Sequence, residues 1–149
     1  MTGIGVHTDT TQLLRNIEKI RKDIPELVRA AVERGALIIE GEAKERCPAD
    51  TGRLRNSITT NSTETGCDVG TNVFYAPYIE YGTGIHAENG NGRETPWSWK
   101  GTGKKGQGWH RTNGMPAQPF LRPALDTKKE EVIEEISETF AELLGEYSE

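Results

Sequence analysis

The first third of the chain shows a regular pattern of apolar and polar positions. Its apolar residues recur mainly at steps of three and four. This is the spacing of one face of an amphipathic helix, and it predicts a helical region over residues 10–46. The apolar positions are Leu13, Ile17, Ile20, Ile24, Leu27, Ala31 and Ile38. Pro25 lies inside the pattern and is expected to kink the helix or split it in two. Cys47 precedes Pro48, so we expect helical geometry to end there.

The pattern changes to a period of two after a short polar stretch. Between Cys67 and Tyr75, hydrophobic or β-branched residues alternate with a mostly polar set, as in a half-buried strand. The preceding string SITTN is expected to pair with this strand as a hairpin. Pro77 then opens one helical turn, which Gly82 ends. Residues 47–82 are therefore expected to form a corner and a small antiparallel sheet.

We expect residues 83–118 to form a long loop or arm that is rich in glycine and tryptophan. The segment contains three tryptophans and eight glycines and shows almost no periodicity. Loops of this length are usually functional or disordered, but a disordered linker should be poor in aromatic residues. Five basic residues also make the segment locally positive. Tryptophan and arginine are preferred anchors of protein interfaces. The candidate interface residues are Arg93, Trp97, Trp99, Lys100, Trp109 and Arg111.

A C-terminal helix is expected within residues 119–149. Its apolar stripe is Leu125, Val132, Ile136, Phe140, Leu143 and Tyr147. The opposite face is acidic, with nine acidic residues and two lysines between Asp126 and Glu149. The fold class is therefore expected to be α+β, in one domain over residues 1–149. We expect a long N-terminal helix, a small antiparallel sheet of about three or four strands, and a C-terminal helix, with both helices packing on the sheet.

Composition argues against nucleic-acid-binding, membrane-bound and disulfide-bonded classes of protein. The formal charge is −5, from 18 basic and 23 acidic residues, so there is no global basic signature of nucleic-acid binding. The sequence has no signal-peptide pattern and no apolar run long enough for a membrane span, which predicts synthesis in the cytoplasm and no membrane contact. Cys47 and Cys67 form no CxxC pair and are expected to be free thiols of a reducing compartment.

The string CPADTGRLRNSI has a catalytic and a structural interpretation. Asp-Thr-Gly at residues 50–52 can be the catalytic loop of an aspartic protease, which needs two carboxylates in an apolar setting. Here two arginines follow directly and should keep Asp50 ionised. In the structural interpretation, Asp50 caps the next helical turn and pairs with Arg53. The expected structural corner consists of Pro48, Asp50, Gly52 and Arg53.

The residue types of the Gly/Trp-rich loop also occur in two other kinds of site. His86, Glu88 and His110 could belong to a metal or nuclease site, but they lack paired ligand spacing, which favours solvated loop residues. Basic residues interleaved with tryptophans can also form a stacking platform for nucleic acid. A nucleic-acid-binding module is therefore the alternative to an interface, and a nuclease is less favoured. No catalytic, cofactor-binding or metal-binding residue is assigned, and no cofactor is expected.

Four strings occur in a characteristic order: EAKERCPADTGRLRNSI, YAPYIEYGTG, GRETPWSWKGTG and GMPAQPFLRPAL. This succession resembles the small neck proteins of long-tailed bacteriophages, the gene-product-10-like family of head–tail joining or tail-completion components. The resemblance runs from about Glu42 to Leu125 and has compatible helices on either side.

The resemblance implies a structural virion protein of a phage or prophage, not an enzyme. Such a protein would act in neck assembly, head–tail joining or tail completion through protein–protein contacts. Its expected partners are head-closure, tail-terminator or tail-tube proteins and further copies of itself in a homo-oligomeric ring, a hexamer by analogy with the tail. The acidic C-terminal helix also suits passive contact with DNA in transit, because like charge keeps the polymer from adhering. The expected location is the virion neck or tail, after assembly in the bacterial host cytoplasm.

Overall fold

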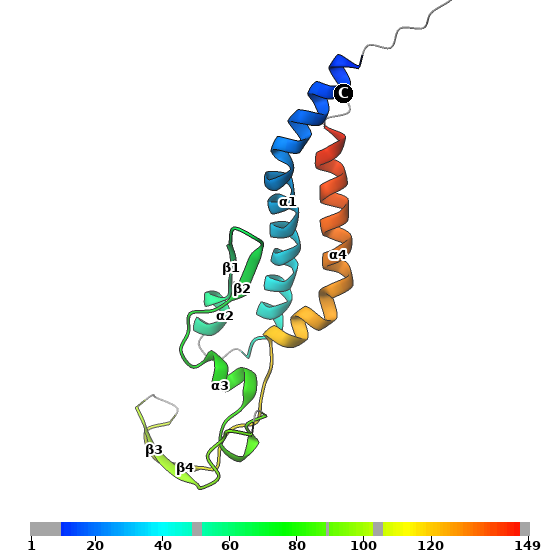
Figure 1. The fold of residues 1–149 in the computed structure, drawn as a ribbon. Helices are drawn as coiled ribbons and strands as arrows, with labels where there is room; N and C mark the ends of the chain where they lie inside the picture. Colours follow the sequence, from blue (N-terminus) through cyan, green and yellow to red (C-terminus); the bar gives the residue numbers. More distant parts are fainter. Residues whose placement is uncertain (1–9, 49–51, 89, 103–105, 147–149) are drawn as a thin grey trace, which may run out of the picture.

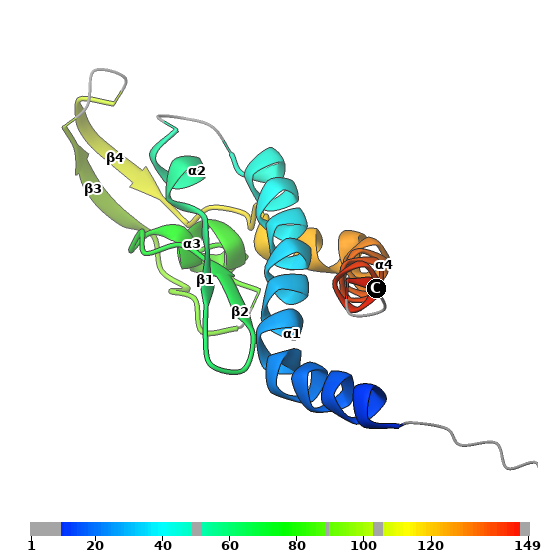
Figure 2. The ribbon, with the colours of Figure 1, turned by 90° about the horizontal axis from the view of Figure 1, so that it is seen from above.

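The computed structural model describes residues 10–48, 52–88, 90–102 and 106–146. Two long helices, α1 (Thr11–Arg46) and α4 (Leu121–Gly145), lie side by side (Figures 1 and 2). The shorter elements between them in the sequence are α2 (Arg53–Ser57), β1 (Thr59–Ser62), β2 (Cys67–Gly70), α3 (Ala76–Tyr81), the 3-10 helix η1 (Gly84–His86), β3 (Trp97–Gly101) and β4 (Gly108–Thr112).

Helix α1 follows the predicted amphipathic pattern over almost its full length. It runs through Pro25 as one helix, so of the two expected outcomes, a kink or a split, the split does not occur. Figure 2 shows the first turns of α1 bending away from the rest. Proline removes one backbone hydrogen bond and crowds the preceding turn, which bends a helix without necessarily ending it. The helix ends at Cys47, whose backbone is extended and whose N–H donates to Ala43 O at 3.0 Å, as the following proline predicts.

Small side chains let α1 and α4 pack closely. Ala31, Gly35 and Ala36 are buried on α1. A Cβ atom added at Gly35 would lie 2.9 Å from Cγ1 of Ile136 and 3.1 Å from Cγ1 of Val132. The helix surface at Gly35 is therefore filled by side chains of α4, and a side chain at this position would require Ile136 to shift.

The four strands of the described chain form two separate antiparallel hairpins. In the first, Thr59 pairs with Gly70 and Ser62 with Cys67, and this hairpin packs on α1. The second, β3–β4, lies at the end of the molecule opposite the start of α1 (Figure 1). The α+β class is confirmed, but the strands do not join into one sheet of three or four. Helix α4 packs mainly along α1, and only its first turns line a pocket together with β2.

The core lies where the end of α1, α2, α3 and the start of α4 converge. Its buried residues are Ala43, Cys47, Leu54, Ile58, Val73, Ala76, Phe120 and Ala124. Strand β2 ends at Gly70, earlier than the alternating pattern predicts, and Val73 enters this core from the segment that follows. None of the helices in the described ranges has the length and apolarity needed to cross a membrane.

Candidate functional site

The expected structural corner connects α1 to α2. Pro48 follows the end of α1, and Gly52 precedes α2 with a φ of 74°, a left-handed conformation that glycine adopts without strain. The Gly52 carbonyl accepts the N–H of Asn56 at 2.9 Å, and Arg53 is the first residue of α2. Asp50 lies outside the described residues, so its cap and its ion pair with Arg53 stay predictions.

A carboxylate from α3 caps the start of α4. Glu80 is only 4% exposed, and its carboxylate accepts the backbone N–H groups of Phe120 at 2.8 Å, Leu121 at 3.0 Å and Arg122 at 3.0 Å. These groups belong to the first turn of a helix, where N–H donors have no partner within the helix. None of the first-turn residues of α4 is acidic, and Phe120 has no polar side chain. Glu80, which is distant in sequence but in direct contact, therefore supplies the negative charge that a helix N-terminus favours.

Arg122 completes this cap. Its Nε donates to Oε1 of Glu80 at 3.0 Å, and its NH2 group donates to the Glu80 carbonyl at 2.8 Å and to Oε2 of Glu88 at 2.7 Å. The guanidinium also lies over the Tyr81 ring, 4.6 Å from its centroid. Burial alone would raise the pKa of the Glu80 carboxyl, but the N–H donors and Arg122 outweigh it and hold the pKa below its ordinary value.

The cap joins two of the four strings that sequence analysis singled out, YAPYIEYGTG and GMPAQPFLRPAL. Glu80 is the acid in the first string, and Arg122 is the arginine in the second. Sequence reasoning missed this pair. Two signals could have found it: a lone acid between aromatic and aliphatic neighbours in a short helical turn, and a long helix that begins without an acid of its own.

Two backbone segments cross beside the cap and fix the base of the Gly/Trp-rich arm. The Thr83 N–H donates to Met115 O at 2.8 Å, and the Ile85 N–H donates to Asn113 O at 3.0 Å. Gly84 and Gly114 lie at the crossing with φ values of 62° and 122°. A Cβ atom at either glycine would lie 1.9 Å from a carbonyl oxygen of the opposite segment, so this crossing requires glycine at both positions.

Beyond the crossing, part of the predicted loop folds as a β-hairpin. Trp99 pairs with His110 and Lys100 pairs with Trp109. The alternation Trp-Ser-Trp-Lys is a period of two, which the expectation of a loop without periodicity overlooked. Because directly paired residues share a face, the candidate interface residues divide into two sets. Trp97 and Trp99 lie on one face, and Lys100, Trp109 and Arg111 lie on the other.

The two faces differ in composition and exposure. On the first, the Trp99 and His110 rings stack with their centroids 4.8 Å apart. On the second, Trp109 is 74% exposed, beside the exposed side chains of Lys100 and Arg111. This second face combines a large aromatic surface with two positive charges. Such a face can bind a protein surface with an apolar centre and acidic rim, or a stacked nucleic-acid base.

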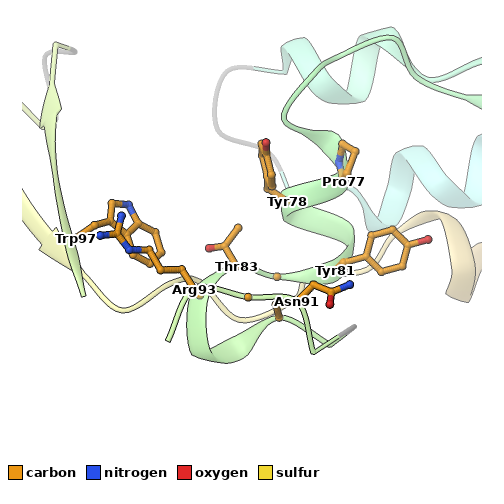
Figure 3. Close-up of a pocket in the computed structure, with 11 residues that line it drawn as sticks. Pro77, Tyr78, Tyr81, Thr83, Asn91, Arg93 and Trp97 are labelled. Atoms are coloured by element: carbon orange, nitrogen blue, oxygen red, sulfur yellow. The ribbon is translucent and has the colours of Figure 1, made fainter. Parts of the chain in front are cut away.

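A mostly apolar groove of about 530 Å³ separates the start of the hairpin from α3. Figure 3 shows Trp97 and Arg93 on one side of it and Pro77 and Tyr78 on the other. The guanidinium of Arg93 lies 5.6 Å from the centroid of the Trp97 ring, a cation–π distance. Arg93 and Trp97 thus form one wall of a groove whose aromatic lining suits an apolar segment of a partner protein.

Two of the three candidate residues for a metal or nuclease site have other partners. Glu88 pairs with Arg122, and Nε2 of His110 donates to the Gly106 carbonyl at 2.8 Å. His86 ends η1. Among the residues that the structure describes, no three His, Cys, Asp or Glu side chains are placed to hold a metal ion.

Comparison with protein families finds a match for part of the chain. A family model described as "Bacteriophage HK97-gp10, putative tail-component" matches residues 11–82. This segment is HK97-gp10-like. The resemblance to the gene-product-10-like family is thereby confirmed over these residues. Comparisons with curated proteins and with solved structures found no match.

The HK97-gp10-like segment covers just under half of the chain and extends from the start of α1 to the end of α3. It contains the string EAKERCPADTGRLRNSI and most of YAPYIEYGTG, whereas the other two strings lie beyond Gly82. The acid of the α4 cap, Glu80, lies inside the HK97-gp10-like segment. The groups that Glu80 binds at the start of α4 lie outside this segment, as do the β3–β4 hairpin and the whole of α4.

Proposed function

We propose that this chain is a structural protein of a long-tailed phage or prophage particle that acts in neck assembly, head–tail joining or tail completion. The HK97-gp10-like match supports a role as a tail component. The observation that supports the finer role is the β3–β4 hairpin, which projects from the helical body and exposes Trp109 to 74% (Figure 1). A projecting arm with an exposed aromatic residue is suited to bind a neighbouring subunit.

The arm combines a fixed base with an adaptable end. The backbone crossing at Thr83 and Met115 and the α4 cap at Glu80 fix where the hairpin leaves the body. The hairpin itself has only two strands and is paired along residues 97–101 and 108–112. Two-stranded hairpins are marginally stable alone in water. Burying the exposed tryptophans against a partner would therefore stabilise both the arm and the assembly.

The partners that we propose are other neck and tail proteins and further copies of this chain. A homo-oligomeric ring, a hexamer by analogy with the tail, places one arm at every subunit boundary. The basic residues of the arm and the acidic α4 give each subunit two oppositely charged surfaces, which favours contacts between copies. DNA in transit would meet the protein passively, in an assembled virion, and no catalysis is required.

Complementation tests the proposal. A phage or prophage that lacks this gene product receives the wild-type chain, Trp109→Ala or Leu37→Ala, and joined particles are counted by electron microscopy. Leu37 is 53% exposed on α1, away from the hairpin, so its substitution is the control. We expect heads and tails to remain unjoined, or tails incomplete, without the protein and with Trp109→Ala. Normal joining without any copy of the protein would overturn the proposed role.

A nucleic-acid-binding module is the alternative function, because Lys100, Trp109 and Arg111 share one exposed face of the hairpin. A stacking contact with two nearby cations would give DNA binding that weakens steeply with salt. A gel shift across a salt series separates the two functions. Salt-dependent binding that Trp109→Ala abolishes would favour the alternative, whereas a protein that does not shift DNA would favour the assembly role.

A further inference from the structure

The apolar stripe of α1 continues beyond the end of α4. Ala31 and Gly35 face α4, and Val28 lines a small cavity shared with Phe140. Toward the N-terminus, the same stripe continues at helical spacing through Ile24 and Ile17. The described part of α4 ends with its helix at Gly145 and the following Glu146. Figures 1 and 2 show the first turns of α1 projecting away from the α1–α4 pair.

The projecting turns expose their apolar side chains. Leu13 is 58% exposed, Ile17 50% and Ile24 39%. A helix that continued the path of α4 would cover them, because they lie on the face of α1 that packs on α4 elsewhere. The projecting stripe, defined as Leu13, Ile17 and Ile24, is therefore shaped to receive a second helix.

Helix α4 carries a partly exposed apolar surface that could pack on this stripe. We call this surface, formed by Ile133, Phe140 and Leu144, the α4 shoulder. Ile133 is 55% exposed, and Phe140 and Leu144 are half-buried. Steps of seven and four place these three side chains on one face of the helix. The exposed side chains of Glu130 and Glu134 border the same face. The shoulder is thus apolar in its centre and acidic along one edge.

The charges of the two helices favour packing of the stripe on the α4 shoulder over packing of two stripes on each other. Residues 11–24 of α1 contain four basic and two acidic residues, whereas residues 126–146 contain eight acidic residues and two lysines. Two projecting stripes placed against each other would bring positive charges together. A stripe on a shoulder brings opposite charges together, and complementary charge favours that pairing.

We propose that the projecting stripe of one copy packs on the α4 shoulder of the next copy. This contact specifies how neighbouring copies would meet in the proposed ring, and it therefore rests on the proposed function. It uses two different surfaces of each subunit, so it is a heterologous contact, which closes into a ring when the rotation between neighbours permits. A symmetric pairing of two stripes would stop at a dimer.

Cysteine cross-linking of the purified full-length chain tests the contact. The double variant Ile17→Cys with Ile133→Cys is oxidised, and its covalent products are compared with those of each single variant. The single variants show which products arise through the native thiols of Cys47 and Cys67. The two new thiols are too far apart to join within one chain. The part of α1 beside Val132 is residue Gly35, 18 positions after Ile17, which is about 27 Å along the helix at 1.5 Å per residue.

We expect the double variant to form a ladder of covalent products beyond the dimer, because each subunit would join two neighbours. A strong dimer from Ile17→Cys alone would place two stripes against each other and overturn the proposal. The absence of covalent products beyond those of the single variants would overturn it as well.

A second measurement uses the uncross-linked protein. Sedimentation of Ile17→Asp should show self-association weakened by at least about tenfold, as for an interface anchor. Leu37→Asp is the matched control, since Leu37 is similarly exposed but lies about 160° from Ile17 around the helix axis. Both variants should melt like wild type. Equal weakening by both variants, or a wild type that does not self-associate, would overturn the contact.

The proposed function and this contact can fail separately. If the protein is found in purified particles and its removal prevents joining, but no ladder forms, the contact is wrong and the function stands. If the ladder forms and the gene product is dispensable for particle assembly, the contact stands and the proposed function is wrong.

Discussion

The carboxylate of Glu80 and the guanidinium of Arg122 lie 3.0 Å apart, 42 positions from each other in the sequence. The same carboxylate accepts three backbone N–H groups at the start of α4, and the same guanidinium reaches the Glu80 carbonyl and Glu88. This pair therefore connects α3, the start of α4 and the base of the β3–β4 arm. It is one of the places where the HK97-gp10-like segment meets the rest of the chain, in addition to the packing of α1 along α4.

We expect removal of the Glu80 carboxylate to destabilise the fold strongly. Glu80→Ala should lower the free energy of unfolding by about 3–5 kcal/mol, because it leaves the buried N–H of Phe120, two part-buried N–H donors and a guanidinium without their acceptor. Glu88→Ala is the control. Glu88 is 45% exposed, so its loss should cost less than about 1 kcal/mol. Urea denaturation measures both, and equal effects would contradict the assigned role of the Glu80 cap.

The pKa of Glu80 also predicts how stability changes with pH. Because this pKa is lower in the folded chain, the stabilisation is fully present above the ordinary glutamate value of about 4.3 and is lost as the pH falls through the lower folded value. The difference in unfolding free energy between wild type and Glu80→Gln should therefore be constant near neutral pH and shrink in acid. A hydrogen bond from Lys44 also lowers the pKa of Glu40, so some acid sensitivity should remain in the variant. A difference that grows in acid would contradict the prediction.

Two glycines of α1 should respond oppositely to substitution by alanine. Nothing lies within 4 Å of a Cβ atom at Gly41, so Gly41→Ala should stabilise the helix by about 0.5–1 kcal/mol. Gly35→Ala gains the same helix propensity but forces Ile136 away from α1, and overpacking costs about 1–3 kcal/mol. Thermal unfolding should therefore show a higher melting temperature for Gly41→Ala and a lower one for Gly35→Ala. Equal stabilisation by both would mean that α4 does not approach α1 at Gly35.

The two cysteines should act as independent thiols. Cys47 is buried in the core, and its burial raises the pKa of the thiol despite the nearby charge of Arg55. Cys67 is half-buried in β2. We expect a thiol reagent to modify Cys67 faster than Cys47 in the folded protein, and both at similar rates in urea. A quantitative Cys47–Cys67 disulfide in assembled particles, detected by mass spectrometry, would contradict this prediction.

The sequence predicted the elements whose periodicity is long. The apolar stripes specified α1 and α4, and the residue pair Cys47-Pro48 specified the end of α1. The sheet was not predictable to the same degree, because four strands of four or five residues do not show whether they join into one sheet or two. The pairing of Trp99 with His110 was missed because each strand has only five residues and a glycine-rich stretch of sequence separates them. The Glu80 cap was missed because it depends on a contact between distant segments, which no local pattern encodes.

The arm should be the part of residues 83–118 whose protection changes most on assembly. The amides of Thr83, Ile85 and Met115 are bonded at the backbone crossing, next to the capped start of α4. Those of β3 and β4 are bonded only across a two-stranded hairpin with an exposed Trp109. Fixing a residue costs about 1–2 kcal/mol, and an isolated hairpin offsets that cost poorly.

Hydrogen exchange followed by mass spectrometry separates these two regions. In the free subunit, we expect peptides from residues 97–112 to exchange faster than peptides that contain the backbone crossing. In joined particles, the hairpin peptides should become protected, because a partner buries Trp109 and the neighbouring basic side chains. Variant Trp109→Ala should lose part of this protection while the crossing stays unchanged. Hairpin amides that are equally protected in the free and assembled states would show that the arm folds without a partner, and its role as an interface would then be wrong.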